Sequence, residues 1–210
     1  MTKTLLINCY QDSAEINQLN DALNKFTVCK VVPYTKIHSG YQLAEDISAV
    51  VVSGSEARIT KPEDKAKYDG VIQLIQNCKV PLLGICFGHQ LLCSAFGAKT
   101  AALKQPVINK FEQVNIIQTG DILSRFRKGQ TVPLAEYHND YVLKDSLDGA
   151  GFNLLADSAS CEVEAVKHKS KLFFGVQFHP ERITIGTESH PEGYRILDNF
   201  YCNNVKRLGI

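Results

Sequence analysis

The chain has 210 residues, of which 44% are hydrophobic and 21% charged, and its formal net charge is +1. This composition is typical of a globular protein, and we expect a single domain over residues 1–210 with one sizeable core. The near-zero charge gives no sign of a nucleic-acid partner, and no apolar run is long enough to span a bilayer, so no membrane association is expected.

The seven cysteines are scattered, and none forms a Cys-x-x-Cys pair. An odd, dispersed set argues against a disulfide framework and against a structural zinc site, so we predict no metal and a reducing, cytoplasmic setting. The chain contains neither a Gly-x-Gly-x-x-Gly motif nor a Walker A motif, and we predict no cofactor.

Strand-like and helix-like segments alternate through the first half of the chain. We expect strands at 4–9, 28–32, 47–52 and 80–85, and helices over 16–26, 60–78 and 87–96. This alternation predicts an α/β fold with a mostly parallel central sheet flanked by helices. Ligands of such sheets bind at the carboxyl ends of the strands.

The second half of the chain is richer in short β-like runs separated by turn signals. It predicts a largely antiparallel continuation of the same domain, because no Pro/Gly/Ser-rich linker separates the halves. The expected strands are 111–117, 131–138, 141–143, 152–156, 163–168 and 172–179. A closing helix is expected to carry Tyr194, Leu197, Phe200, Tyr201 and Leu208.

One stretch has the pattern of a nucleophile elbow. A short apolar strand leads into Gly84-Ile-Cys86-Phe-Gly88, and a helical pattern follows. Such a turn exposes its central residue, and the following helix offers free N–H groups that favour a thiolate and an oxyanion. Cys86 taken alone fits a catalytic nucleophile and a small buried side chain about equally well.

A base and an orienting acid for this cysteine are available further along the chain. His179 and Glu181 are two residues apart at the end of an expected strand, so they point the same way if the strand continues. An imidazole beside a thiol takes its proton, and a carboxylate fixes the imidazole tautomer. Each residue alone also fits an ordinary surface side chain. His138 lies in a polar turn and either lines a pocket or simply forms the turn.

Two motifs together resemble the class I, triad-type glutamine amidotransferases. They are Pro81-Leu-Leu-Gly-Ile-Cys86-Phe-Gly-His-Gln90 and Gly175-Val-Gln-Phe-His179-Pro-Glu181. The resemblance covers about residues 47–200 and implies a flavodoxin-like fold. It implies that Cys86 attacks the side-chain amide of L-glutamine, that His179 acts as base and then acid, and that Glu181 orients His179. A γ-glutamyl thioester forms and is hydrolysed, which makes the chain a cysteine-dependent glutaminase.

The resemblance also implies which residues surround the substrate. The backbone N–H of Phe87 and one from the loop at Gly54 and Ser55 would hold the oxyanion. Ser55 replaces a glycine of the family's usual loop, and a side chain there disfavours a positive φ. The implied substrate-binding residues are Gln90, His138, Asn139, Asp140 and Tyr141.

Within the family, several segments resemble the glutaminase part of GMP synthase. They are Tyr137–Val142, Glu164–His168, and Thr187-Glu188 with Gly193. By contrast, Asn8–Gln11 departs from the pattern of GMP synthases. The segment Gly88-His89-Gln90 fits the glutaminases of anthranilate and aminodeoxychorismate synthases equally well. This resemblance predicts ammonia transfer to a separate synthase subunit. The alternatives are a stand-alone hydrolase of γ-glutamyl amides or peptides and, third, a catalytically silent partner-binding module.

Overall fold

The computed structural model describes residues 2–206, so Leu208 of the expected closing helix lies outside the described residues. Five parallel strands form one half of the sheet, in the order β2-β1-β3-β4-β9. Their bounds are β1 (Lys3–Asn8), β2 (Val28–Pro33), β3 (Ile47–Val52), β4 (Leu82–Ile85) and β9 (Phe173–Val176). This is the flavodoxin-like strand order. It places the carboxyl ends of β1, β3, β4 and β9 side by side at one end of the sheet.

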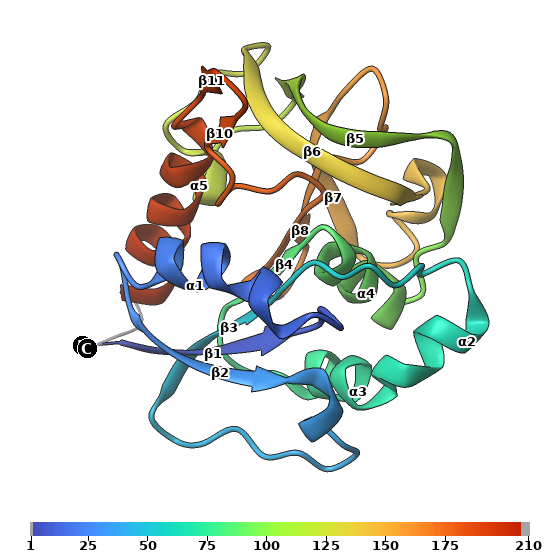
Figure 1. Ribbon diagram of the computed structural model, residues 1–210, viewed down its shortest axis with the longest axis vertical. Coiled ribbons are helices and arrows are strands. Elements are labelled where there is room, and N and C mark those ends of the chain that lie inside the picture. Colours follow the sequence, from blue (N-terminus) through green and yellow to red (C-terminus); the bar gives the residue numbers. More distant parts are fainter. Residues whose placement is uncertain (1, 207–210) are drawn as a thin grey trace.

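The same sheet continues beyond β9 with antiparallel strands, in the order β9-β8-β7-β5-β6. These strands are β5 (Thr100–Ile116), β6 (Thr131–Val142), β7 (Phe152–Asp157) and β8 (Ala165–His168). Figure 1 shows β5 and β6 as a long curved pair that arches over α4. The predicted fold class, a mixed α/β sheet with an antiparallel second half, is therefore confirmed.

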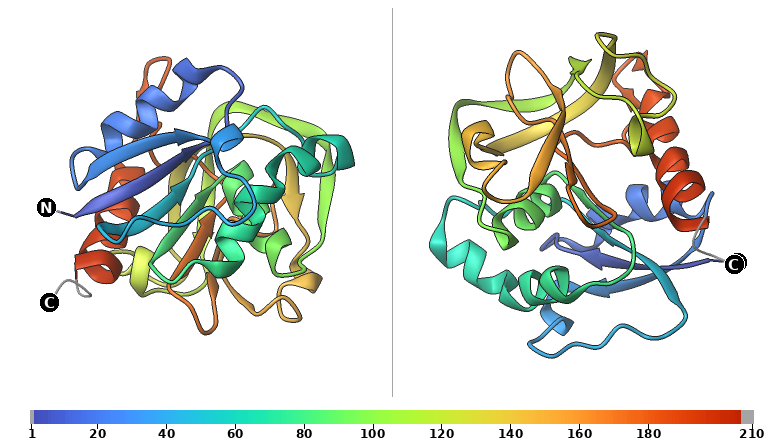
Figure 2. Two further views of the ribbon diagram at one scale, coloured as in Figure 1. Left: turned by 90° about the horizontal axis from the view of Figure 1, so that it is seen from below. Right: turned by 180° about the vertical axis from the view of Figure 1, so that it is seen from behind.

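Helices cover both faces of the sheet (Figures 1 and 2). On one face, α1 (Asn17–Leu23) and α5 (Glu192–Phe200) pack against side chains such as Leu6 and Val51. On the other, α3 (Asp69–Asn77) and α4 (Phe87–Ala95) pack against the alternate residues of the same strands. Because successive strand residues point to opposite faces, the apolar runs bury one set of side chains on each side.

The remaining elements are short. They are α2 (Pro62–Lys65), the hairpin of β10 (Thr184–Ile185) and β11 (Glu188–Ser189), the 3₁₀ turns Ser13–Ile16, Tyr34–Lys36, Ala66–Tyr68, Asp121–Leu123 and Lys144–Ser146, and the π-helical turn Tyr201–Val205.

Several sequence-based boundaries were wrong, among them the strand expected at 172–179, which ends at Val176, and three larger differences. The helix expected over 60–78 is interrupted by a 3₁₀ turn at Ala66–Tyr68. The strands expected at 131–138 and 141–143 are one strand, β6, because the polar residues between them still pair with β5. The strand β5 starts eleven residues earlier than expected, at Thr100 rather than Phe111, since its first part is mostly exposed and its apolar residues do not alternate with polar ones.

Candidate active site

Cys86 occupies the turn between β4 and α4. Its backbone has φ 51° and ψ −106°, a conformation that residues with a side chain rarely adopt. The turn is fixed by two backbone bonds, from the Cys86 N–H to the Val176 carbonyl (2.8 Å) and from the Gly88 N–H to the Ser53 carbonyl (3.1 Å). A Cβ at Gly88 would lie 2.2 Å from the Val52 carbonyl oxygen, so only glycine fits. The structure therefore forms the elbow that the spacing predicts.

His179 and Glu181 lie beside Cys86, in the turn that follows β9. The Nδ1 atom of His179 is 2.7 Å from Oε1 of Glu181, and each side chain is 3% exposed. The His179 N–H donates to the Ala135 carbonyl at 2.8 Å, which ties this turn to β6. Since Nδ1 is committed to Glu181, Nε2 is the nitrogen available to the Cys86 thiol. The pair does not depend on a continued strand, because β9 ends at Val176.

The charges around His179 change its basicity. Burial alone would lower the imidazole pKa, but the electrostatic and hydrogen-bonding interactions with Glu181 and Cys86 outweigh burial and raise the pKa to about 9. Burial would raise the pKa of Glu181, but the His179 imidazole more than offsets this and holds that pKa below its ordinary value. The site therefore contains an ionised carboxylate that makes the imidazole a stronger proton acceptor.

The loop after β3 faces this group. A Cβ at Gly54 would lie 2.6 Å from the Tyr10 hydroxyl oxygen and 3.1 Å from Cε1 of His179, so Gly54 is packed against the histidine ring. The Ser55 hydroxyl accepts the Ala57 N–H at 3.1 Å and lies 2.9 Å from the Tyr68 hydroxyl, so it holds the loop from behind.

Backbone donors near Cys86 remain free. The N–H groups of Phe87 and Ser55 have no hydrogen-bond acceptor among residues 2–206. Phe87 is the first residue of α4, so its N–H adds to the positive end of the helix. The φ angle of Ser55 is not positive, so the serine occupies the loop without the strain expected from the loss of a glycine.

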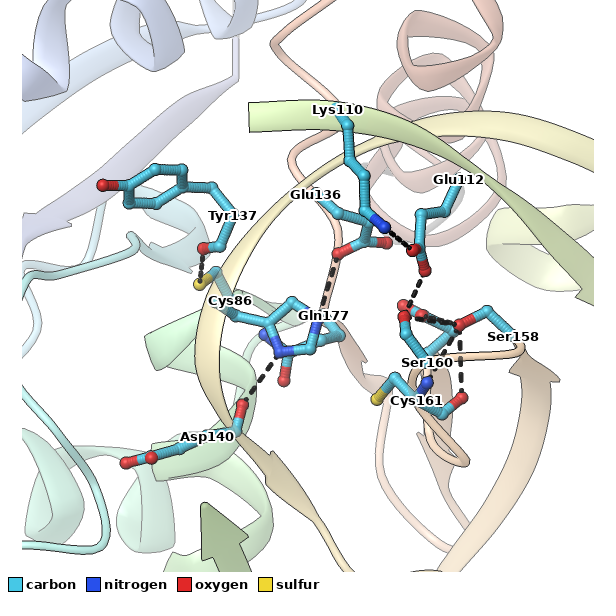
Figure 3. Close-up of polar contacts among 12 residues, drawn as sticks. Cys86, Lys110, Glu112, Glu136, Tyr137, Asp140, Ser158, Ser160, Cys161 and Gln177 are labelled. Atoms are coloured by element: carbon cyan, nitrogen blue, oxygen red, sulfur yellow. Dashed lines mark hydrogen bonds and ion pairs between the residues drawn. The ribbon is translucent and has the colours of Figure 1, made fainter. Parts of the chain in front are cut away.

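Two hollows meet at Cys86. The first, of about 170 Å³, lies between the loop 55–58 and the segment 137–140 of β6. The second, of about 470 Å³, lies on the His179 side and is also lined by Tyr10 and Arg182. Ser55, Glu56 and Tyr137 line both hollows. The Tyr137 carbonyl lies 3.5 Å from the Cys86 sulfur (Figure 3), so β6 forms the wall opposite the elbow.

The residues expected to bind substrate differ in what they offer to the first hollow. The Gln90 amide nitrogen donates to the Asp140 carbonyl (2.7 Å) and lies 3.0 Å from Oε1 of Gln177, so this group is used within the protein. The His138 ring is 3.1 Å from the same carbonyl through Nδ1. Asn139 lines the hollow.

Tyr141 does not line either hollow at Cys86. It lines a different hollow, with Lys104 and Pro106, where β6 continues and pairs Tyr141 with Ala101. Sequence reasoning also missed Arg58, which lies near Cys86 in the fold and bonds Asp140, 82 positions away. No spacing rule pairs residues so distant in the chain.

Behind β6 lies a buried acidic pair. Glu136 and Glu164 contact each other and are 1% and 0% exposed. Burial, together with the charge of Glu164, raises the pKa of Glu136 well above its ordinary range, and burial raises the pKa of Glu164 to about 7. The Ser158 hydroxyl donates to Glu164 at 2.6 Å. Figure 3 shows Glu136 and Gln177 between Cys86 and the Ser158 turn.

In the part of the chain that the structure describes, no group of three or more His, Cys, Asp or Glu side chains is arranged to hold a metal ion. No helix among residues 2–206 is long and apolar enough to cross a membrane.

The fold and the elbow define a known class of protein. Residues 5–204 match the family Glutamine amidotransferase class-I, so the chain belongs to the class I glutamine amidotransferases. Proteins similar in sequence to this chain include A subunits of glutamine-hydrolysing GMP synthases. The one from Methanothermobacter thermautotrophicus is 36% identical over 130 residues, 62% of this chain and 64% of that protein. The one from Methanococcus aeolicus is 32% identical over 181 residues, 86% of each chain.

A solved structure agrees with these sequence relatives. It is described as a GMP synthase subunit protein from Thermoplasma acidophilum and superposes with a TM-score of 0.79 at 27% identity. The superposition covers 96% of this chain and 92% of that one. The chain is thus similar over most of its length to subunits of a glutamine-hydrolysing synthase.

Proposed function

We propose that this chain hydrolyses the side-chain amide of glutamine through a Cys86–His179–Glu181 triad and supplies ammonia to a separate GMP synthase-like subunit. The observation that carries the proposal is the arrangement at the sheet edge. A strained cysteine at a helix N-terminus lies beside a buried imidazole, whose Nδ1 is 2.7 Å from a buried carboxylate.

The chemistry follows from these positions. Cys86 gives its proton to Nε2 of His179 and attacks the amide carbon of glutamine. The oxyanion that forms is held by the free N–H groups of Phe87 and Ser55. His179 then returns the proton to the departing nitrogen, which leaves as ammonia and a γ-glutamyl thioester on Cys86.

Water completes the cycle. It attacks the thioester carbon, His179 takes a proton from it, and glutamate leaves as the Cys86 thiolate is reformed and protonated. Glu181 keeps Nδ1 protonated throughout, which leaves Nε2 to exchange protons with the reacting groups. The hollow of about 170 Å³ is the proposed place of the glutamine side chain.

A second function is supported by the larger hollow. This hollow, of about 470 Å³, lies on the His179 side, where the leaving amine receives its proton. A substituted amine therefore also fits there. This favours the hydrolysis of other γ-glutamyl amides as the alternative activity.

The test is ammonia release from glutamine by the wild type and by Cys86→Ala, alone and with a GMP synthase subunit that lacks its own glutaminase. We expect release that requires Cys86 and rises when the synthase subunit is present. No release from glutamine under either condition would contradict the proposal. Release from γ-glutamylmethylamide but not from glutamine would favour the alternative.

A further inference from the structure

Glu136 carries a buried carboxyl group that the proposed reaction does not use. It lies on β6, the strand that forms one wall of the smaller hollow, and its side chain is fully buried behind that wall. Its neighbours in the chain contact the active site. The Ala135 carbonyl accepts the His179 N–H at 2.8 Å, and the Tyr137 carbonyl lies 3.5 Å from the Cys86 sulfur. The position of Glu136 is therefore tied to both contacts through one peptide bond on each side.

His138 connects this carboxyl group to the hollow. Successive residues of a strand point to alternate faces, so Glu136 and His138 lie on the same side of β6. Nε2 of His138 lies 3.6 Å from Oε2 of Glu136, and Nδ1 lies 3.1 Å from the Asp140 carbonyl oxygen. The Gln90 amide donates to the same carbonyl at 2.7 Å. The His138 ring thus helps to hold the backbone of Asp140, which lines the hollow.

The Asp140 carbonyl fixes the tautomer of the His138 ring. A carbonyl oxygen can only accept, so Nδ1 carries a proton, and in the neutral ring Nε2 then has a lone pair. This lone pair faces Glu136, which satisfies it only when the carboxyl group is protonated. If the ring takes that proton instead, the imidazolium donates to the carboxylate. In both cases one proton lies between His138 and Glu136.

Glu164 adds a second reason for a proton at this place. It faces Glu136 from the residue before β8, and its Oε1 accepts the Ser158 hydroxyl at 2.6 Å. Oε2 of Glu164 and both carboxyl oxygens of Glu136 have no hydrogen-bond partner among residues 2–206. Two buried carboxylates in contact repel each other strongly. Glu136, Glu164 and His138 must therefore hold at least one proton among them.

The groups around these three side chains make a negative charge on Glu136 unfavourable. Other ionisable groups that face them are Lys110 and Glu112 on β5, Asp157 on β7, Cys161 before β8, Cys86 at the elbow, His89 on α4, Asp140 on β6, and His179. Lys110 is used by Glu112, at 2.5 Å. Burial and the charge of Glu164 raise the pKa of Glu136 well above its ordinary range, so the proton is lost only on the alkaline side.

We propose that Glu136 is a positioning residue, whose buried proton holds the His138 ring and, through the Asp140 carbonyl, keeps the segment 137–140 in the shape that binds glutamine. The proposal rests on the proposed function, in which glutamine occupies the hollow of about 170 Å³. Loss of the last proton leaves a carboxylate against the His138 lone pair and against Glu164. The ring then turns from the Asp140 carbonyl, and the affinity for glutamine falls.

The test measures the dissociation constant of glutamine against pH in protein that cannot hydrolyse it. The parent protein carries Cys86→Ala, and three further proteins add Glu136→Gln, Glu136→Met or the control Glu45→Gln, an exposed glutamate. The amide introduced by the first change keeps an N–H for the His138 ring and does not titrate. The thioether introduced by the second has a similar size and no donor. Titration calorimetry from pH 6 to 9 gives each constant.

At pH 6 we expect Glu136→Gln to bind glutamine within about twofold of the parent, and Glu136→Met to bind it roughly tenfold more weakly. From pH 6 to 9 the affinity of the parent should fall roughly tenfold relative to that of Glu136→Gln, because only the parent loses the buried proton. Groups common to both proteins cancel in this ratio. Glu45→Gln should follow the parent at every pH.

The same pH dependence in the parent and in Glu136→Gln would overturn the inference and leave the proposed function intact. Equal binding by Glu136→Gln and Glu136→Met at pH 6 would do the same, because the donor would then have no role. With Cys86 restored, alkylation by iodoacetamide at pH 6 should change less than about twofold in Glu136→Gln. A larger slowing would show that Glu136 supports the elbow in general, against the inference. If the parent binds no glutamine at any pH, both the glutamine site and the inference are wrong.

Discussion

The Nδ1 atom of His179 lies 2.7 Å from Oε1 of Glu181, in a turn rather than a strand, with both side chains buried. This turn is anchored by the bond from the His179 N–H to the Ala135 carbonyl and by the close approach of α5, where a Cβ at Gly193 would lie 2.3 Å from the Pro180 carbonyl oxygen. The geometry of the pair is therefore set by tertiary packing.

Replacement of Glu181 by glutamine should lower activity and move its pH dependence. The charge of Glu181 contributes to the raised His179 pKa of about 9, so in Glu181→Gln the imidazole loses its proton at lower pH. We expect kcat/KM to fall on the order of a hundredfold, with the alkaline limb of its pH profile shifted downward. The measurement is ammonia release from pH 6 to 10.

The control for this variant is Glu15→Gln, which removes an acid at the rim of the larger hollow. Its pH profile should match that of the wild type. An alkaline limb that stays in place in Glu181→Gln would show that Glu181 does not set the basicity of His179.

The buried acidic pair predicts a loss of stability with rising pH. In the unfolded chain both carboxyls lose their protons near pH 4.3, whereas the folded pKa of Glu164 is raised to about 7 and that of Glu136 well above its ordinary value. Between these values the folded state binds more protons than the unfolded state, so the free energy of unfolding falls as pH rises.

The variant Glu164→Gln has no carboxyl to ionise at this position. It should therefore lose less unfolding free energy than the wild type between pH 5 and 8, by on the order of 2–3 kcal/mol. Urea unfolding at several pH values measures the difference, with Glu45→Gln, an exposed residue, as control. If the unfolding free energies of Glu164→Gln and of the wild type change in parallel with pH, Glu164 is ionised in the folded protein.

The close packing of the elbow predicts that Gly88 cannot be replaced by a residue with a side chain. A methyl group there meets the Val52 carbonyl oxygen at 2.2 Å, so Gly88→Ala should destabilise the protein by roughly 2 kcal/mol or more and displace Cys86. Gly149 has open space around its Cα, and Gly149→Ala should be near neutral. Thermal unfolding of the two variants makes the comparison, and equal melting temperatures would contradict the close packing at the elbow.

The sequence predicts the parallel strands and the elbow well, because each has a strong local signal. The run from Ile47 to Val52 and the Gly-x-Cys-x-Gly spacing depend only on neighbours in the chain. The long strand β5 was mostly missed, since the apolar residues between Thr100 and Asn109 do not alternate with polar ones and the strand is defined by its pairing with β6.

For the candidate site, local patterns pick out the residues that follow strands, such as Cys86 and His179. They do not identify contacts across the fold. The bond between Arg58 and Asp140 and the pairing of Glu136 with Glu164 depend on β6 crossing the sheet edge, which no local pattern encodes. The family resemblance covers the whole segment Tyr137–Tyr141, but it does not show that β6 pairs Tyr141 with Ala101 and places it in a different hollow.

The central claim is that Cys86 forms a γ-glutamyl thioester with glutamine. The most direct measurement is acid quenching of the protein with glutamine at steady state, followed by mass spectrometry of the peptide that contains Cys86. We predict a γ-glutamyl adduct on Cys86 that hydroxylamine removes and that is absent from Cys86→Ala and His179→Ala. Ammonia release that persists unchanged in Cys86→Ala, with no adduct on the wild-type cysteine, would contradict the account.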